Sequence, residues 1–169
     1  VSGKFAQTIR ADAMDVSFYE TSGDWNGGKV YFTGQSLTDA WFTATLAFKD
    51  QSLKWATHVG FYFEIDGTEH IIAVGEDRNG GVGVYRTTQQ NGADTPVNDG
   101  KYVFSTAQKD VFMSETGLPV AVHYKDGTFT AYVKTDAVWT KVYEYTVTGA
   151  TNKAITACGI NVRTYQTNV

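Results

Sequence analysis

Cysteine and proline are nearly absent from this chain, which has one Cys and two Pro among 169 residues. A single Cys excludes an internal disulfide, and the three His residues lack the spacing of a Cys/His metal site. No apolar run approaches the ~20 residues that a membrane-spanning helix needs. No basic segment followed by an apolar one opens the chain. The sequence therefore predicts no membrane partner.

Charge is also scarce: 19% of residues are charged, and the formal net charge is -4. The charges are scattered rather than grouped in blocks, which is typical of a solvated surface. Nucleic-acid binding needs a surplus of Lys and Arg on one face, so we expect no nucleic-acid partner. The length fits one domain. We expect residues 1–169 to form a single monomeric domain excised from a larger multidomain protein.

Aromatic residues make up 14% of the chain, and 17 Gly residues supply turns between Thr- and Val-rich stretches. Aromatic and β-branched residues suit a pleated sheet, and Gly suits the turns that join strands. The composition alone favours an all-β protein.

Apolar and polar residues alternate along most of the chain, with a period of two. Residues 41–48 place Phe42, Ala44, Leu46 and Phe48 on one face. Residues 118–136 predict a hairpin around the two-residue turn Asp126-Gly127, with Tyr124 paired to Phe129, Val122 to Ala131, His123 to Thr130 and Ala121 to Tyr132. Residues 157–165 turn Cys158, Ile160 and Val162 inward, so Cys158 is expected to be a small core residue rather than a nucleophile.

Helical periodicity is weak, and 106–117 is the best stretch for a short turn or helix. Many short strands with one apolar face, in one domain, predict two packed antiparallel sheets. We predict an antiparallel β-sandwich, most simply a jelly roll.

Three stretches resemble the concanavalin A-like superfamily, especially laminin-G-like domains and carbohydrate-binding modules. They are WFTATLAF, the hairpin VAVHYKDGTFTAYV, and the closing ITACGINVRTY. The resemblance implies a secreted or cell-surface domain attached to catalytic or cell-surface modules of the same parent chain. It also implies a structural calcium ion, for which Asp77, Asn79, Asp94, Asn98 and Asp99 are the oxygen-rich candidates; no other cofactor is expected.

The stretch 64–69 has two interpretations. Its letters, EIDGTE, fit the Glu-x-Asp-x-x-Glu pattern of laminarinase-like retaining glycosidases, in which Glu64 would be the nucleophile and Glu69 the acid/base. Asp66-Gly67 between two apolar strands also predicts a hairpin, which we favour. A two-residue turn would place Glu64 and Glu69 directly opposite each other, and a three-residue turn with a bulge would separate them.

Aromatic and polar residues are predicted to share the faces that point away from the apolar layer. Flat rings stack on the apolar face of a sugar, while Arg, Asn, Glu and His orient its hydroxyls. The candidate ligand-binding residues are Trp41, Trp55, Tyr62, Glu64, Tyr85, Arg86, His123, Tyr132, Asn161, Arg163 and Tyr165. Two further aromatic candidates are Trp25, in a Gly-rich loop, and Trp139, expected on one strand face with Lys141, Tyr143 and Tyr145.

Three functions follow from these features. The leading hypothesis is a non-catalytic carbohydrate-binding module that recognises a poly- or oligosaccharide outside the cell or at its surface. The second is a protein-interaction or adhesion domain of laminin-G-like fold. The third is a small glycoside hydrolase that uses Glu64 and Glu69, and it requires the less favoured interpretation of 64–69.

Overall fold

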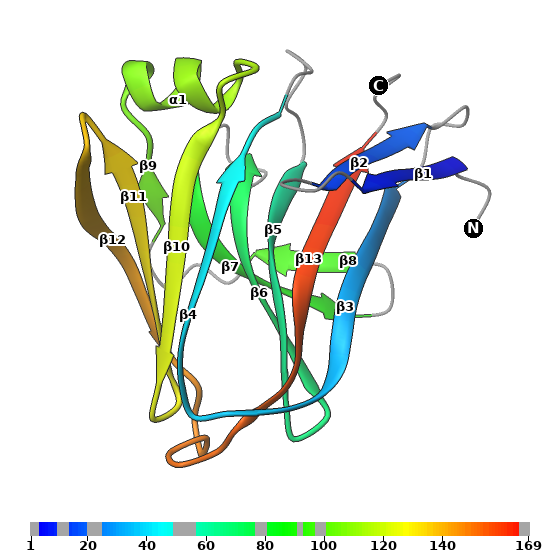
Figure 1. Cartoon of the computed structure of the whole chain (residues 1–169), viewed down its shortest axis with the longest axis vertical. Coiled ribbons are helices and arrows are strands. Elements are labelled where there is room, and N and C mark those ends of the chain that lie inside the picture. Colours follow the sequence, from blue (N-terminus) through cyan, green and yellow to red (C-terminus); the bar gives the residue numbers. More distant parts are fainter. Residues whose placement is uncertain are drawn as a thin grey trace.

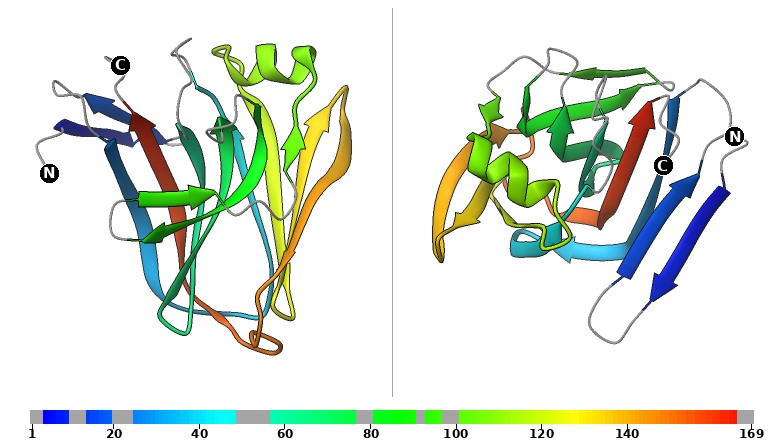
Figure 2. Two further views of the ribbon diagram at one scale, coloured as in Figure 1. Left: turned by 180° about the vertical axis from the view of Figure 1, so that it is seen from behind. Right: turned by 90° about the horizontal axis from the view of Figure 1, so that it is seen from above.

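The computed structural model describes residues 4–9, 14–19, 25–48, 57–76, 81–90, 93–96 and 101–165. Within them the chain forms strands β1 to β13 and one short helix, α1 (Thr106–Phe112). Two antiparallel sheets lie face to face, as Figures 1 and 2 show, and the prediction of an all-β sandwich is confirmed. No helix among the described residues is long and apolar enough to cross a membrane.

The smaller sheet has four strands in the order β12-β11-β10-β4. Their bounds are β12 (Val138–Thr146), β11 (Thr128–Thr135), β10 (Leu118–Lys125) and β4 (Asp39–Leu46). The register of β10 and β11 has each of the four predicted residue pairs, from Ala121 opposite Tyr132 to Tyr124 opposite Phe129. The hairpin predicted around Asp126-Gly127 is therefore confirmed.

The larger sheet has the order β3-β13-β5-β6-β7-β8, and the short β9 pairs with β7. The bounds are β3 (Trp25–Leu37), β13 (Ile155–Tyr165), β5 (His58–Ile65), β6 (Thr68–Glu76), β7 (Val82–Gln90), β8 (Ala93–Pro96) and β9 (Tyr102–Val103). Strands β1 (Lys4–Ile9) and β2 (Met14–Tyr19) pair only with each other within the described residues, as a separate hairpin.

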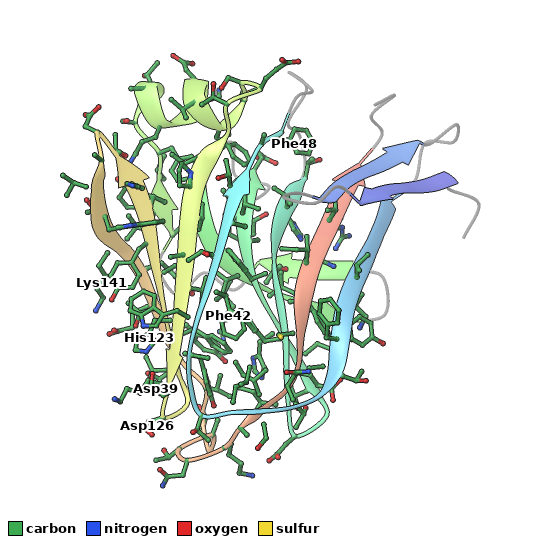
Figure 3. The ribbon with its side chains drawn as sticks, viewed as in Figure 1. Asp39, Phe42, Phe48, His123, Asp126 and Lys141 are labelled. Atoms are coloured by element: carbon green, nitrogen blue, oxygen red, sulfur yellow. The ribbon has the colours of Figure 1, made fainter. Side chains whose placement is uncertain are left out.

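The hydrophobic core fills the space between the two sheets. Phe63 on β5 is fully buried and packs against Phe129 and Phe42, with ring centroids 4.8 Å apart in both cases. Phe42, Ala44, Leu46 and Phe48 all face this core, as their alternation predicts. Figure 3 shows Phe42 on the side of β4 that faces the larger sheet.

Helix α1 lies at one end of the sandwich (Figure 1), within the stretch predicted to be a short helix. Ser105 caps its N-terminus in a capping box: the Gln108 backbone N–H donates to Ser105 Oγ at 3.2 Å, and the Ser105 backbone N–H donates to Gln108 Oε1 at 3.0 Å. Phe112 in its last turn is fully buried and packs on Phe104. The helix thus covers one end of the core.

One prediction about β12 is wrong. Trp139, Lys141, Tyr143 and Tyr145 were expected on one strand face. In the structure, Lys141 pairs with Tyr132 and Tyr143 pairs with Ala131. The two β11 residues are neighbours, but their partners on β12 are separated by Val142, which is therefore an extra residue without a partner position on β11. Such a bulge shifts the alternation by one residue. Trp139 and Lys141 consequently face outward, while Tyr143 and Tyr145 face the core.

Candidate functional site

The outer face of the four-stranded sheet carries an exposed aromatic group built on β4, β10 and β11. Trp41 on β4 lies directly opposite His123 on β10, and their rings stack at 4.3 Å with an interplanar angle of 7°. One ring face of Trp41 is covered by this imidazole, yet the residue remains 57% exposed. The uncovered ring surface therefore faces solvent on edge strand β4.

Alternation along β4 and β10 places two charged side chains next to this stack. Asp39 precedes Trp41 by two residues on the same face, and it lies opposite Lys125. His123 Nε2 lies 2.7 Å from Asp39 Oδ1, and Lys125 Nζ lies 2.9 Å from Asp39 Oδ2. The hydrogen bond from His123, followed by that from Lys125, lowers the pKa of the Asp39 carboxyl. Figure 3 shows Asp39 and His123 on the side of this sheet away from the larger sheet.

The ionised Asp39 carboxylate holds the imidazole in place, and the imidazole in turn supports the Trp41 ring. Asp39 is about half exposed, so its remaining acceptor capacity is open to solvent. Tyr132 on β11 extends the aromatic surface, with its ring 5.3 Å from Trp41 at an angle of 38°. Trp41, His123, Tyr132, Asp39 and Lys125 are called the platform below.

A second charged pair lies beside the platform on β12. Lys141 Nζ donates to Glu144 Oε2 at 2.6 Å, and the Thr130 hydroxyl donates to the same carboxylate at 3.3 Å. The hydrogen bond from Lys141 lowers the pKa of Glu144. The platform is therefore flanked by fixed acceptors and donors, which suits hydroxyl groups of a ligand that stacks on Trp41.

Trp41, His123 and Tyr132 belong to the predicted ligand-binding set, and the structure brings all three together. Sequence reasoning missed Asp39, Lys125 and Glu144. Asp39 and Lys125 were within reach of prediction, because each lies two residues from Trp41 or His123 on a strand. Glu144 was not, because the bulge at Val142 places it on the outer face.

Four other predicted ligand residues lie on the face of the larger sheet that points away from the core. Tyr62, Tyr85, Asn161 and Arg163 are there as the alternation predicts, but each is less than 5% exposed. Asn161 Oδ1 lies 2.8 Å from His58 Nε2, and the Tyr85 hydroxyl donates to the Glu76 carbonyl oxygen at 2.9 Å. The expectation that these side chains are exposed is wrong, because they form a buried polar layer.

Arg86 lies on the opposite face from its neighbour Tyr85, because successive strand residues alternate. Its guanidinium carbon is 3.7 Å from the centre of the Tyr145 ring, between the two sheets. Arg86 therefore does not join Tyr85, with which it was grouped.

The stretch 64–69 is a hairpin with a two-residue turn: Asp66 and Gly67 both have positive φ, and Glu64 lies opposite Glu69. Lys29 on β3 forms an ion pair with Glu69. Thr156 donates to Glu64 Oε1 at 3.3 Å, and the Tyr62 hydroxyl donates to Glu69 Oε1 at 3.2 Å. These contacts offset the repulsion between two facing carboxylates. The two Glu residues belong to different strands, β5 and β6.

Several predicted residues fall outside what the structure describes. They are Trp55, Asp77, Asn79, Asn98 and Asp99, together with the side chains of Trp25, Asp94 and Tyr165. Among the side chains that are described, no group of three or more His, Cys, Asp or Glu residues is placed to hold a metal ion. Cys158 packs against the core, and burial raises the pKa of its thiol.

The solved structures similar to this chain include one described as the CBM2 module of the evolved Dit of Lactobacillus casei BL23 phage J-1. It superposes with a TM-score of 0.52 at 11% sequence identity, over 89% of this chain and 69% of that one. No protein-family model and no curated protein sequence matches. At this identity the likeness shows a shared β-sandwich fold.

Proposed function

We propose that this domain is a non-catalytic carbohydrate-binding module whose sugar ligand stacks on Trp41. The observation that carries the proposal is the exposed indole, stacked on His123 and flanked by Asp39 and Lys125. A solvent-exposed Trp held in one orientation loses little conformational freedom when a flat apolar sugar face binds to it. Fixed carboxylate and ammonium groups nearby give the hydroxyls acceptors and donors.

The fold supports the same function. A protein of similar fold is described as the CBM2 module of a phage Dit, and CBM denotes a carbohydrate-binding module. A shared fold supports function only by analogy, so the platform remains the stronger argument. The proposal includes a concanavalin A-like fold, action outside the cell or at its surface, and linkage to catalytic or cell-surface modules.

The test is native affinity electrophoresis against soluble β-glucans, galactomannan, xylan and pectin, followed by an assay of the same mixtures for new reducing ends. We expect retardation by at least one polysaccharide without cleavage. Trp41→Ala should weaken that retardation at least about tenfold, which corresponds to ~1.4 kcal/mol. Phe32→Ala is the matched control, because Phe32 is an exposed aromatic residue (72%) on β3 of the other sheet.

Three outcomes would contradict the proposal. Equal retardation of the wild type and Trp41→Ala would place the sugar elsewhere. New reducing ends that vanish in Glu64→Gln would make the protein a glycoside hydrolase. No retardation by any polymer, together with capture of a protein partner that sugar does not compete away, would favour an adhesion domain.

A further inference from the structure

The outer face of the four-stranded sheet carries a second exposed indole, Trp139, at the far end of β12. It is 44% exposed, and the bulge at Val142 places it on the same face as Trp41. Its cross-strand partner is Lys134, whose Nζ lies 5.9 Å from the centre of the indole ring. The sheet therefore presents two large stacking surfaces on one side.

Tyr132 lies between the two indoles. Along the register of the sheet, Trp41 is level with His123, Thr130 and Glu144. Tyr132 follows Thr130 by two residues on the same face of β11. Lys134, which is opposite Trp139, follows Tyr132 by two more residues. Trp41, Tyr132 and Trp139 thus form a diagonal line from edge strand β4 to edge strand β12, which is called the aromatic diagonal below.

The length of the aromatic diagonal follows from sheet geometry. Three strand spacings separate β4 from β12, and four residues along the strands separate the two levels. With ~4.8 Å between strands and ~3.3 Å per residue, the two Trp Cα atoms lie about 20 Å apart. A monosaccharide cannot reach both indoles, whereas several linked sugar rings can.

Four charged groups beside the aromatic diagonal are neutralised in two pairs, whereas Lys134 lies over the Trp139 ring. Asp39 pairs with Lys125 near one end, and Glu144 pairs with Lys141 near the middle. Each carboxylate is about half exposed, so it retains acceptor capacity for a hydroxyl group. With Lys134 the two pairs leave one net positive charge, not the cluster of cations that binding an acidic polymer would require.

We propose that the aromatic diagonal binds the interior of an extended, uncharged polysaccharide chain, with one sugar unit on Trp41 and another on Trp139. This inference rests on the proposed function and adds the length and charge class of the ligand. Tyr132 supports the chain between the two indoles. Affinity then depends on the number of linked units, because a short oligosaccharide reaches only one Trp.

The experiment is isothermal titration calorimetry with cello-, laminari- and manno-oligosaccharides of two to six units, and with the parent polymers. For the wild type, affinity should rise at least tenfold from the disaccharide to the hexasaccharide in one series. Trp139→Ala should lose most of this gain, because its hexasaccharide complex keeps only the contact with Trp41. Trp139→Tyr should restore part of the gain because it keeps a ring at the same place. Phe32→Ala is again the control.

The extended site fails if Trp139→Ala binds the hexasaccharide and the polymer as tightly as the wild type does. It also fails if affinity is constant beyond the disaccharide. In both cases loss of binding in Trp41→Ala would leave the proposed function intact. Binding of polygalacturonate or heparin alone, titrated in the same way, would overturn the uncharged ligand class. Absence of all sugar binding in the wild type would overturn the proposed function itself.

Discussion

His70 on β6 is a buried imidazole between the two sheets, and it is 4% exposed. Its ring lies 6.0 Å from Phe129 and 6.2 Å from Tyr145 between ring centroids, and neither ring nitrogen has a hydrogen-bond partner within the described part of the chain. Burial, and then the positive charge of Arg86, lower its pKa from the usual 6.5 to about 4. Protonation of His70 therefore opposes folding.

This pKa shift predicts a pH-dependent stability. The folded protein keeps His70 neutral, whereas the unfolded chain binds the proton below about pH 6.5. The stability that neutral His70 allows is fully present above pH 6.5 and falls as the pH drops toward 4. Across that window the loss amounts to at most about 3 kcal/mol. Urea unfolding of the wild type and His70→Leu at several pH values measures it.

The comparison with His70→Leu removes the contribution of the carboxylates, which titrate in both proteins. The wild type should lose more unfolding free energy than the variant between pH 6.5 and 4. Parallel pH profiles for the two proteins would show that His70 titrates normally in the folded state.

His123 gives a second prediction at the same scale. It covers one face of Trp41 and is held by Asp39. His123→Ala frees the indole to adopt other rotamers, so sugar affinity should fall several-fold with little change in stability. His123→Phe keeps a ring against the indole and should recover most of the affinity in the same titration. Equal weakening by both substitutions would assign the effect to the imidazole nitrogens instead.

Among the elements, the hairpin turns can be compared directly. The first has Asp66 and Gly67, the second Asp126 and Gly127, and the third Asp136 and Ala137, all with positive φ. A left-handed conformation costs a residue with a Cβ about 1–2 kcal/mol relative to Gly. The space around the two glycines also differs. A Cβ on Gly67 would meet nothing within 4 Å, whereas a Cβ on Gly127 would lie 2.8 Å from the carbonyl of Ala150.

The turns therefore predict a graded series of unfolding free energies. Gly67→Ala should destabilise the protein by about 1 kcal/mol through backbone strain alone. Gly127→Ala should cost more, because the Ala150 backbone must also move. Ala137→Gly should stabilise by up to about 1 kcal/mol through relief of the same strain. Chemical denaturation of the three variants gives the order, and an equal loss in both Gly→Ala variants would exclude the contact with Ala150.

Strand positions and pairings were largely predictable from the sequence, because a period of two and Asp-Gly turns determine them locally. The pairing of Tyr124 with Phe129 and the core-facing side chains of β4 follow from such rules. The bulge in β12 did not follow, since Val142 fits a regular strand as well as a bulge. The sequence also did not predict whether a polar face is exposed. Asn161 lies on the expected face of the sheet, but it is buried.

For the whole molecule, ligand binding and stability depend on different residues. The platform lies on the outer face, whereas the free energy of folding comes mainly from the core between the sheets. Phe63→Ala should cost about 3–5 kcal/mol, because the residue is fully buried. Trp41→Ala should change stability far less, because Trp41 is 57% exposed. Thermal unfolding with and without the bound sugar tests both.

Saturating sugar should raise the melting temperature of the wild type, since a ligand present at a hundred times its dissociation constant adds about 2.7 kcal/mol. Without sugar, Trp41→Ala should melt near the temperature of the unliganded wild type. The same sugar concentration should stabilise it by no more than about 1.4 kcal/mol, because its affinity is at least tenfold lower. A large fall in its melting temperature without sugar would instead make Trp41 a structural residue. The spatial site could not be predicted in full, because it combines β4 with the β10–β11 hairpin, which is far from β4 in the sequence.

The bulge at Val142 also affects how this chain compares with its relatives. Before Val142, the odd-numbered residues of β12 face solvent; after Val142, the odd-numbered residues face the core. A homologue without this residue would have to align with a gap inside a strand, where gaps are usually penalised. If that homologue were aligned without a gap, each of its residues near Trp139 would be matched to a residue on the opposite face of β12. Deletion of Val142 would remove the bulge and make the pairing with β11 regular, with Trp139 still opposite Lys134 on the outer face.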